Sequence, residues 1–274
     1  MARVPRRILP GFRLTLGFTL SYLGVMVLIP LVACLVRVSS LTWPQFWGAV
    51  WTPRVRAAFI FSFEVSLSAA LISVLLGTLI AWVLVRYDFP FRRFFDSMVD
   101  LPFALPTAVA GLVYSSLYVE SGWLGRFLVP LGINGAYSPL AVVLVLVFVG
   151  MPFVVRTVQP VLETFDGEME EAAHLLGANR WQTFWRVLFP NMIPAAVAGF
   201  TLAFARALGE YGSVVFVSSN MPFKTEIAPV LIVSRLEEYA YPEASAIAAV
   251  LLGCSFAMLV LINALDRWVR QNGT

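Results

Sequence analysis

The 274-residue chain is 59% hydrophobic and 13% charged, and its formal net charge at pH 7 is +3. Soluble domains carry about 25% charged residues, so this composition excludes an ordinary soluble domain and indicates an all-α integral membrane protein. The basic residues are scattered, and no nucleic-acid partner is expected. The single histidine, His174, and two distant cysteines, Cys34 and Cys254, argue against a metal site, a catalytic triad or a disulfide framework.

Six apolar segments are long enough to cross a bilayer, which requires about 20 apolar residues per helix. In chain order they are residues 14–36, 59–85, 98–119, 139–158, 193–219 and 243–265. The third contains Pro102 and Pro106 and the fourth contains Gly150 and Pro152, so kinks are expected there. This predicts tails at 1–13 and 267–274, a first span with an external loop at 14–57, and a transmembrane domain at 58–266 with a long loop at 159–192.

An even number of spans places both termini on the same side of the membrane. Twelve of the 19 Lys and Arg residues lie in the two tails and in the loops at 86–97 and 156–192, against six in the opposite loops. Basic residues are enriched on the cytoplasmic side. Both termini and the loop at 159–192 are therefore predicted to be cytoplasmic.

The loop at 159–192 has the start and stop signals of two short helices. Asp166 is expected to cap the first helix, and Gly177 fits a left-handed helix terminator. Asn179 and Gln182 have the spacing of a capping box for the second helix, which Pro190 is expected to end. The loop is thus predicted to form a helix–glycine–helix elbow over residues 166–190, called the elbow below.

Each helix of the elbow carries apolar residues at i, i+3, i+4 and i+7, a spacing that places them on one face. These are Met169, Ala172, Ala173 and Leu176 in the first helix, and Trp181, Phe184, Trp185 and Leu188 in the second. Two interpretations fit this pattern. The elbow either lies on lipid headgroups or presents an aromatic docking surface to a soluble partner.

Ionisable residues within the spans are costly and face protein or water. Arg206 and Glu210 lie one helical turn apart in the fifth span and are expected to pair, which either locks helices together or gives an anion path its positive potential. Ser213 and Thr107 are candidate hydrogen-bond donors to such a path. Glu64 is expected near a helix interface, with a proton relay as the alternative. Arg156 lies at the predicted cytoplasmic edge of the fourth span, and its guanidinium is expected to be solvated.

The elbow resembles a signature of the membrane subunits of bacterial ABC importers: EAA, three residues, Gly, nine residues, then I-x-L-P. Glu171, Ala172, Ala173, Gly177 and Pro190 stand at these positions, while Val187 and Phe189 replace the usual Ile and Leu. The resemblance implies the ABC type-1 permease fold of type I importers. It also implies that the elbow is a coupling helix whose aromatic residues, Trp181, Phe184 and Trp185, dock in a groove of a cytoplasmic ATPase.

Longer stretches resemble the T-type permease subunit of sulfate and thiosulfate importers, namely DLPFALPTAVAGL (100–112), PFVVRTVQPVLE (152–163) and FARALGEYGSVVFVSSN (204–220). The resemblance implies translocation of sulfate or thiosulfate across a bacterial inner membrane. The implied partners are an ATPase dimer, a W-type second permease that makes a heterodimer, and an external sulfate- or thiosulfate-binding protein. The molybdate and tungstate permeases of the same family are the alternative.

The chain carries no phosphate-cradling G-x-x-x-x-G-K-[ST] loop, because its single lysine, Lys224, follows Phe223. It is therefore predicted to bind no cofactor and to be no enzyme by itself, while ATP and Mg²⁺ are used by the separate ATPase. An ion-coupled secondary transporter is the rival from another class. A membrane enzyme is disfavoured, because no H-E-x-x-H or G-x-S-x-G motif is present.

Overall fold

The computed structural model describes residues 11–165 and 167–272, and this part of the chain is built from helices. Five helical runs in it are long and apolar enough to cross a membrane: Phe12–Ser39, Pro53–Arg86, Pro139–Thr164, Arg180–Leu208 and Tyr241–Ala264. Their positions agree with five of the six predicted spans. The predicted third span at 98–119 is not a continuous helix.

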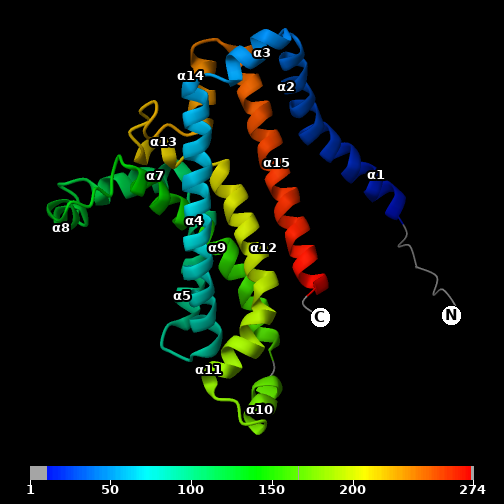
Figure 1. Ribbon diagram of the computed structural model, residues 1–274, viewed down its shortest axis with the longest axis vertical. Coiled ribbons are helices and arrows are strands. Elements are labelled where there is room, and N and C mark those ends of the chain that lie inside the picture. The colour runs from blue at the N-terminus through cyan, green and yellow to red at the C-terminus, as the bar shows by residue number, and fades with distance from the viewer. Residues whose placement is uncertain (1–10, 166, 273–274) are drawn as a thin grey trace.

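The first run consists of α1 (Phe12–Leu23), a π-helical turn η1 (Gly24–Leu28) and α2 (Ile29–Ser39). None of its residues is buried, and α1 leans away from the other helices (Figure 1). A short helix α3 (Trp43–Val50) follows, within the predicted external loop, and it begins with a capping box formed by Thr42 and Gln45. Three tryptophans around α3, Trp43, Trp47 and Trp51, stack edge to face and suit a membrane interface.

The longest helix described is α4 (Pro53–Arg86), which runs from near α3 toward the end that carries α10 and α11 (Figure 1). Its first turn is fixed by Arg54, whose guanidinium makes two hydrogen bonds, of 2.9 and 2.7 Å, to the Glu226 carboxylate. One face of α4 packs on α9 (Pro139–Thr164) and α12 (Phe189–Leu208). These three helices form the core of the described structure.

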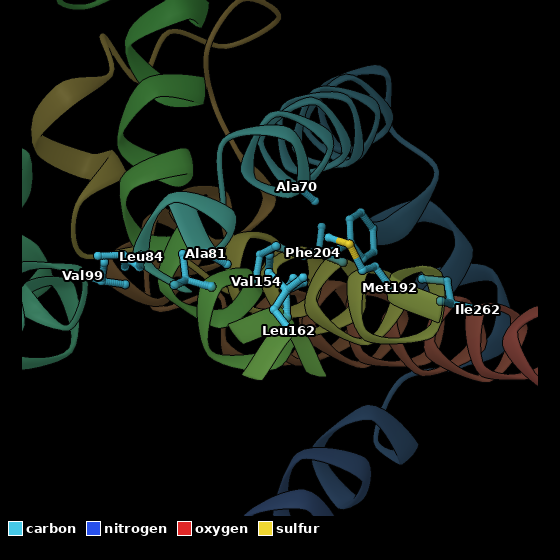
Figure 2. Close-up of a cluster of buried hydrophobic side chains, with 13 residues drawn as sticks. Ala70, Ala81, Leu84, Val99, Val154, Leu162, Met192, Phe204 and Ile262 are labelled. Carbon is cyan, nitrogen blue, oxygen red and sulfur yellow. The ribbon is translucent and has the colours of Figure 1, made fainter. Parts of the chain in front are cut away.

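The core helices approach one another closely around Val154 of α9. A Cβ atom added at Gly77 of α4 would lie 2.8 Å from the Val154 Cβ, and one added at Gly199 of α12 would lie 2.8 Å from the Val154 Cα. Small residues at such crossings allow the close backbone contact on which helix association in membranes depends. Buried apolar side chains, including Leu162, Met192 and Phe204, continue the contact in one band (Figure 2).

The predicted third span is divided into α5 (Arg92–Val99), α6 (Leu101–Ala104) and α7 (Thr107–Tyr118). The prediction of one kinked helix was wrong, because Pro106 forces Leu105 into an extended conformation, which separates α6 from α7. In Figure 1, α5 lies toward the end that carries α10 and α11, while α7 lies nearer the other end. The segment therefore leads the chain from the end of α4 back toward the opposite end of the molecule, from which α8 and η2 connect it to α9.

Beyond α7 the chain continues outward through α8 (Gly125–Leu128) and the 3-10 turn η2 (Val129–Leu131), which project from the bundle (Figure 1). Helix α9 then runs six residues beyond the predicted end of the fourth span at 158, so the first part of the predicted loop at 159–192 is helical. Both Pro152 and Pro160 lie inside α9.

The loop and the fifth span are arranged differently from the prediction. After α10 (Gly167–Leu175), one helical run contains α11 (Arg180–Thr183), the π-helical turn η3 (Phe184–Leu188) and α12. The fifth span therefore ends at Leu208 rather than at 219, because the chain leaves the helix at Gly209. Two short helices follow, α13 (Val214–Val217) and α14 (Ala228–Glu237). The final helix is α15 (Tyr241–Asn272), which packs against α2, α12 and α14.

We predict that Gly199→Ala lowers the stability of the chain by about 1–3 kcal/mol, because the added methyl overpacks the contact with α9. The matched control is Gly253→Ala on α15, where an added Cβ meets no atom within 4 Å. This control is expected to leave stability unchanged or raise it by about 0.5–1 kcal/mol, since alanine favours a helix more than glycine does. Thermal unfolding of both variants in detergent measures the difference, and equal shifts would contradict the prediction.

Candidate functional site: the elbow and the break after α12

The elbow lies at one end of the molecule, opposite α3 and α14 (Figure 1). Helix α10 ends as the sequence predicts, with Gly177 in the left-handed conformation at φ +83°. The backbone N–H of Gly177 donates to the carbonyl of His174 over 2.9 Å, and that of Ala178 donates to the carbonyl of Ala173 over 3.0 Å. These two bonds are those of a Schellman motif, and they fix the turn between the two helices. The predicted cap of α10, Asp166, lies outside the described residues.

The second helix also begins as predicted. Asn179 and Gln182 form a reciprocal capping box, with N–H to side-chain oxygen distances of 2.9 and 2.8 Å. The prediction that Pro190 ends this helix was wrong. Pro190 lies exposed in the first turn of α12. The π-helical turn η3 precedes it, and its wider i→i+5 hydrogen bonding lets the helix continue past a residue that has no N–H to donate.

The apolar residues of the elbow do not form two uniform faces. Ala173, Thr183 and Leu188 are buried and Phe184 is half-buried, so these residues hold the elbow together. Leu175, Leu176 and Trp181 point outward, with exposed fractions of 89%, 90% and 71%. Glu171, Ala172 and Trp185 are exposed as well. The outward surface made by Leu175, Leu176 and Trp181 is called the elbow tip below; Leu175 was not among the residues predicted for it.

A clamp joins the elbow to the end of α4. The Arg86 guanidinium lies 2.5 Å from the Glu170 carboxylate of α10 and stacks over the Trp82 ring at 5.5 Å. The Trp82 ring in turn meets the Phe184 ring edge to face, with 5.4 Å between centroids. The clamp was missed from sequence, although a basic residue at the end of a span is a signal for such a contact.

The four residues predicted for an anion path are brought together where α12 ends. Arg206 donates a hydrogen bond to one oxygen of Glu210, and the other oxygen accepts the N–H and the hydroxyl of Ser213 over 2.9 and 3.0 Å. Glu210 is 2% exposed, whereas the Arg206 side chain remains 34% exposed. Thr107 lies beside this cluster, because a Cβ at Gly212 would be 2.3 Å from the Thr107 hydroxyl.

Glu210 therefore acts as a bracket between α12 and α13. Its carboxylate satisfies the Ser213 N–H at the start of α13, while the N–H groups of Gly209 and Glu210 donate to carbonyls of α12, so the backbone of this break finds partners inside the protein. The pairing of Arg206 with Glu210 is confirmed. The half-exposed guanidinium leaves donors that a passing anion can reach, so the cluster suits either a helix lock or an anion contact.

Arg156 differs from its prediction. Its guanidinium, expected to be solvated, makes two hydrogen bonds to the Asp100 carboxylate, over 2.8 and 2.7 Å, and one to Asp96 over 2.6 Å. Gln159 accepts a further bond over 2.7 Å. The network ties α9 to α5 and to the residue between α5 and α6. The spacing of Asp96 and Asp100, one helical turn apart at the start of the predicted third span, was the available signal.

A protein-family model described as "Binding-protein-dependent transport system inner membrane component" matches residues 73–271. Two curated relatives carry the name "Sulfate transport system permease protein CysT". The one from a Synechocystis species is 51% identical over 92% of this chain and 88% of the relative. The one from Escherichia coli K12 is 45% identical over 95% of this chain and 94% of the relative.

Solved structures show the same fold. A crystal structure of a bacterial ABC transporter that imports the acidic polysaccharide alginate matches with a TM-score of 0.78 at 15% identity, covering 94% of this chain and 95% of that chain. The same kind of transporter in complex with an alginate pentasaccharide-bound periplasmic protein matches with a TM-score of 0.78 at 16% identity, covering 98% of both chains.

Proposed function

Because the chain belongs to the family of binding-protein-dependent transport system inner membrane components, we propose that it is the permease through which an ABC importer moves sulfate or thiosulfate. The observation that carries the proposal is the 45–51% identity to sulfate permeases over more than nine-tenths of the chain. The chain is a multi-pass inner-membrane component and not the ATPase. ATP and Mg²⁺ are used by the partner ATPase.

The elbow tip is the surface proposed to dock on the ATPase. Leu175, Leu176 and Trp181 are uncovered in the isolated chain, and apolar area removed from water contributes about 25 cal/mol per Å². The rigid turn at Gly177 and the Arg86–Glu170 clamp support this role, since they keep the tip fixed relative to α4 and α12. When the ATPase moves the elbow tip, α4 and α12 then move with it as one rigid body.

We propose six crossings, with the elbow and both termini in the cytoplasm. The broken segment α5–α6–α7 supplies the crossing that no long helix provides, and the distribution of basic residues supports the orientation. The surface at the α3 and α14 end then faces the external binding protein. Alternating access would open a path toward this end and then toward the elbow end.

Uptake of radiolabelled sulfate tests the proposed function directly. The chain is expressed with its ATPase, second permease and binding protein in cells that lack sulfate uptake. We expect uptake that depends on ATP. An excess of unlabelled thiosulfate is expected to reduce this uptake at least tenfold, and the same concentration of molybdate is expected to reduce it less than twofold. Equal inhibition by molybdate would favour a molybdate or tungstate permease, and uptake without the ATPase would favour an ion-coupled transporter.

We predict that Leu176→Asp reduces co-purification of the ATPase at least tenfold and abolishes uptake, because it places a charge at the centre of the elbow tip. Leu176 is 90% exposed, so its replacement leaves the fold of the chain intact. The matched control is Leu131→Asp at η2, which is 74% exposed and far from the elbow. This control is expected to retain the ATPase, and equal loss in both variants would argue against the elbow tip.

The turn offers an independent control on the same prediction. Gly177→Val must adopt φ +83°, which a β-branched residue resists, whereas Gly177→Asn tolerates that region. Neither side chain meets a neighbouring atom at its Cβ. Val is therefore expected to weaken ATPase binding and Asn to retain it.

For the anion path we predict that the double variant Arg206→Gln/Glu210→Gln lowers sulfate uptake at least tenfold. The amide at position 210 keeps the size of glutamate and an oxygen for Ser213, and the shorter amide at position 206 stays neutral and polar, so the variant removes the guanidinium that compensates a desolvated dianion without leaving a buried carboxylate unpaired. Thermal unfolding of the variant serves as the control for folding. Uptake within twofold of the parent chain would show that the pair only locks α12 to α13.

A further inference from the structure

Two hollows meet beside the end of α4 that lies next to α5. One is an apolar groove of about 460 Å³ along α4. Its lining residues are Leu79, Ile80, Val83, Leu84, Phe89 and Phe95. The other is a pocket of about 670 Å³, whose polar lining consists of Asp88, Arg92, Arg93, Asp96, Gln159 and Glu163. Leu84 and Phe89 line both hollows, so the groove leads directly into the pocket, and the two together are called the α4–α5 site below.

The order of the two hollows along α4 matches the layers of a membrane. Leu79 and Val83 lie within the apolar run of α4 and are 59% and 37% exposed, so the groove opens on the outer surface of the helix. The charged residues of the pocket follow Arg86, at which the helix and its apolar run end. The groove therefore lies at the level of the hydrocarbon and the pocket at the level of the headgroups.

Helix α5 has the character of a helix that lies in the membrane interface. At helical spacing its apolar residues and the residue before it share one face, and all of them are exposed: Phe91, Phe94, Phe95 and Met98. Arg92, Arg93 and Asp96 fall on the opposite face and line the pocket. A helix of this kind buries its apolar face at the boundary between headgroups and acyl chains. This places the pocket in the headgroup layer independently of the groove.

Two charges of the pocket are left for a ligand. Its other carboxylates have cationic partners within the chain, in the ion pairs Arg92–Asp88 and Arg156–Asp96. The Arg93 guanidinium makes no hydrogen bond or ion pair with the residues that the structure describes. Glu163 accepts a hydrogen bond from the amide of Gln159 over 3.2 Å but meets no cation in the same part of the chain. The pocket thus offers one guanidinium and one carboxylate, which is the complement of a zwitterion.

We propose that the α4–α5 site binds a phospholipid with an ethanolamine headgroup. One acyl chain lies in the groove, the Arg93 guanidinium binds the phosphate, and the Glu163 carboxylate accepts hydrogen bonds from the ammonium group. A phosphatidylglycerol headgroup brings no cation to Glu163, and a choline headgroup has no N–H to donate to it. A free phosphate ion would leave the apolar groove empty. The inference does not depend on which anion the chain transports.

Native mass spectrometry of the full chain tests the ligand. The chain is purified in detergent, stripped of bound lipid and incubated with equal concentrations of dioleoyl phosphatidylethanolamine, phosphatidylcholine or phosphatidylglycerol. We expect the chain to retain at least fivefold more of the ethanolamine lipid than of either other lipid. Equal retention of any two of the three would overturn the inference. Displacement of the lipid by an excess of inorganic phosphate would assign the pocket to a free anion and overturn it as well.

Two charge variants distinguish the pocket from general contact with lipid. Arg93→Gln is expected to lower retention of the ethanolamine lipid at least fivefold. Glu163→Gln is expected to remove the preference for the ethanolamine lipid over phosphatidylglycerol, because the ammonium loses its counter-charge. The matched control is Arg126→Gln, an exposed arginine in α8 that is expected to leave both readouts unchanged. Thermal unfolding verifies that each variant folds, and an unchanged lipid preference in either pocket variant would overturn the inference.

The groove is tested without altering any charge. Val83→Trp obstructs the groove next to the pocket and is expected to lower retention of the ethanolamine lipid at least fivefold. The matched control is Val32→Trp on α2, where the valine is 53% exposed and lies outside the α4–α5 site. This control is expected to retain the lipid. Full retention by Val83→Trp, or the same loss in both variants, would contradict an acyl chain in the groove.

Discussion

The close approach of α4, α9 and α12 around Val154 is the constraint on which the rest of the structure depends. Gly77 and Gly199 permit this contact, and a side chain at either position would push the helices apart. Because α12 continues without interruption from the elbow, the crossing also fixes the elbow to the core. Trp181 of the elbow tip is thus carried by a helical run that meets α4 and α9 at one tightly packed point.

Charged side chains hold the places where helices are interrupted. Arg156 joins α9 to Asp96 and Asp100 beside the start of the broken segment, and Glu210 brackets the non-helical residues after α12. Arg54 pairs with Glu226 ahead of α14. Interrupted backbone needs such partners where water is scarce, because an unsatisfied peptide group inside a membrane costs several kcal/mol. Among these acidic groups, Glu64 differs because its own chain supplies no partner within the described residues.

Local signals in the sequence predicted local structure well. The capping box of Asn179 and Gln182, the left-handed Gly177 and five of the six spans depend on neighbours in sequence or on apolar runs, and the structure contains them. Features that depend on contacts between distant segments were missed. Arg156 was expected in solvent because its partners lie about 60 positions earlier, and the inward turn of Phe184 depends on Trp82. The separation of α6 from α7 was also missed, although its cause is local: the residue before a proline favours an extended conformation, and Leu105 before Pro106 adopts one.

The unbroken run from Arg180 to Leu208 has a mechanical consequence. It contains 29 residues and is about 43 Å long at 1.5 Å per residue. Its tight contact with α9 is at Gly199, which lies about 28 Å from Arg180 and about 10 Å from Arg206 along the helix. If the run rotates by about 5° around this contact, the elbow end moves by about 2.5 Å and Arg206 moves by about 0.9 Å in the opposite direction. The run is therefore a lever with unequal arms, which converts a larger displacement at the elbow into a smaller and more forceful one at Arg206.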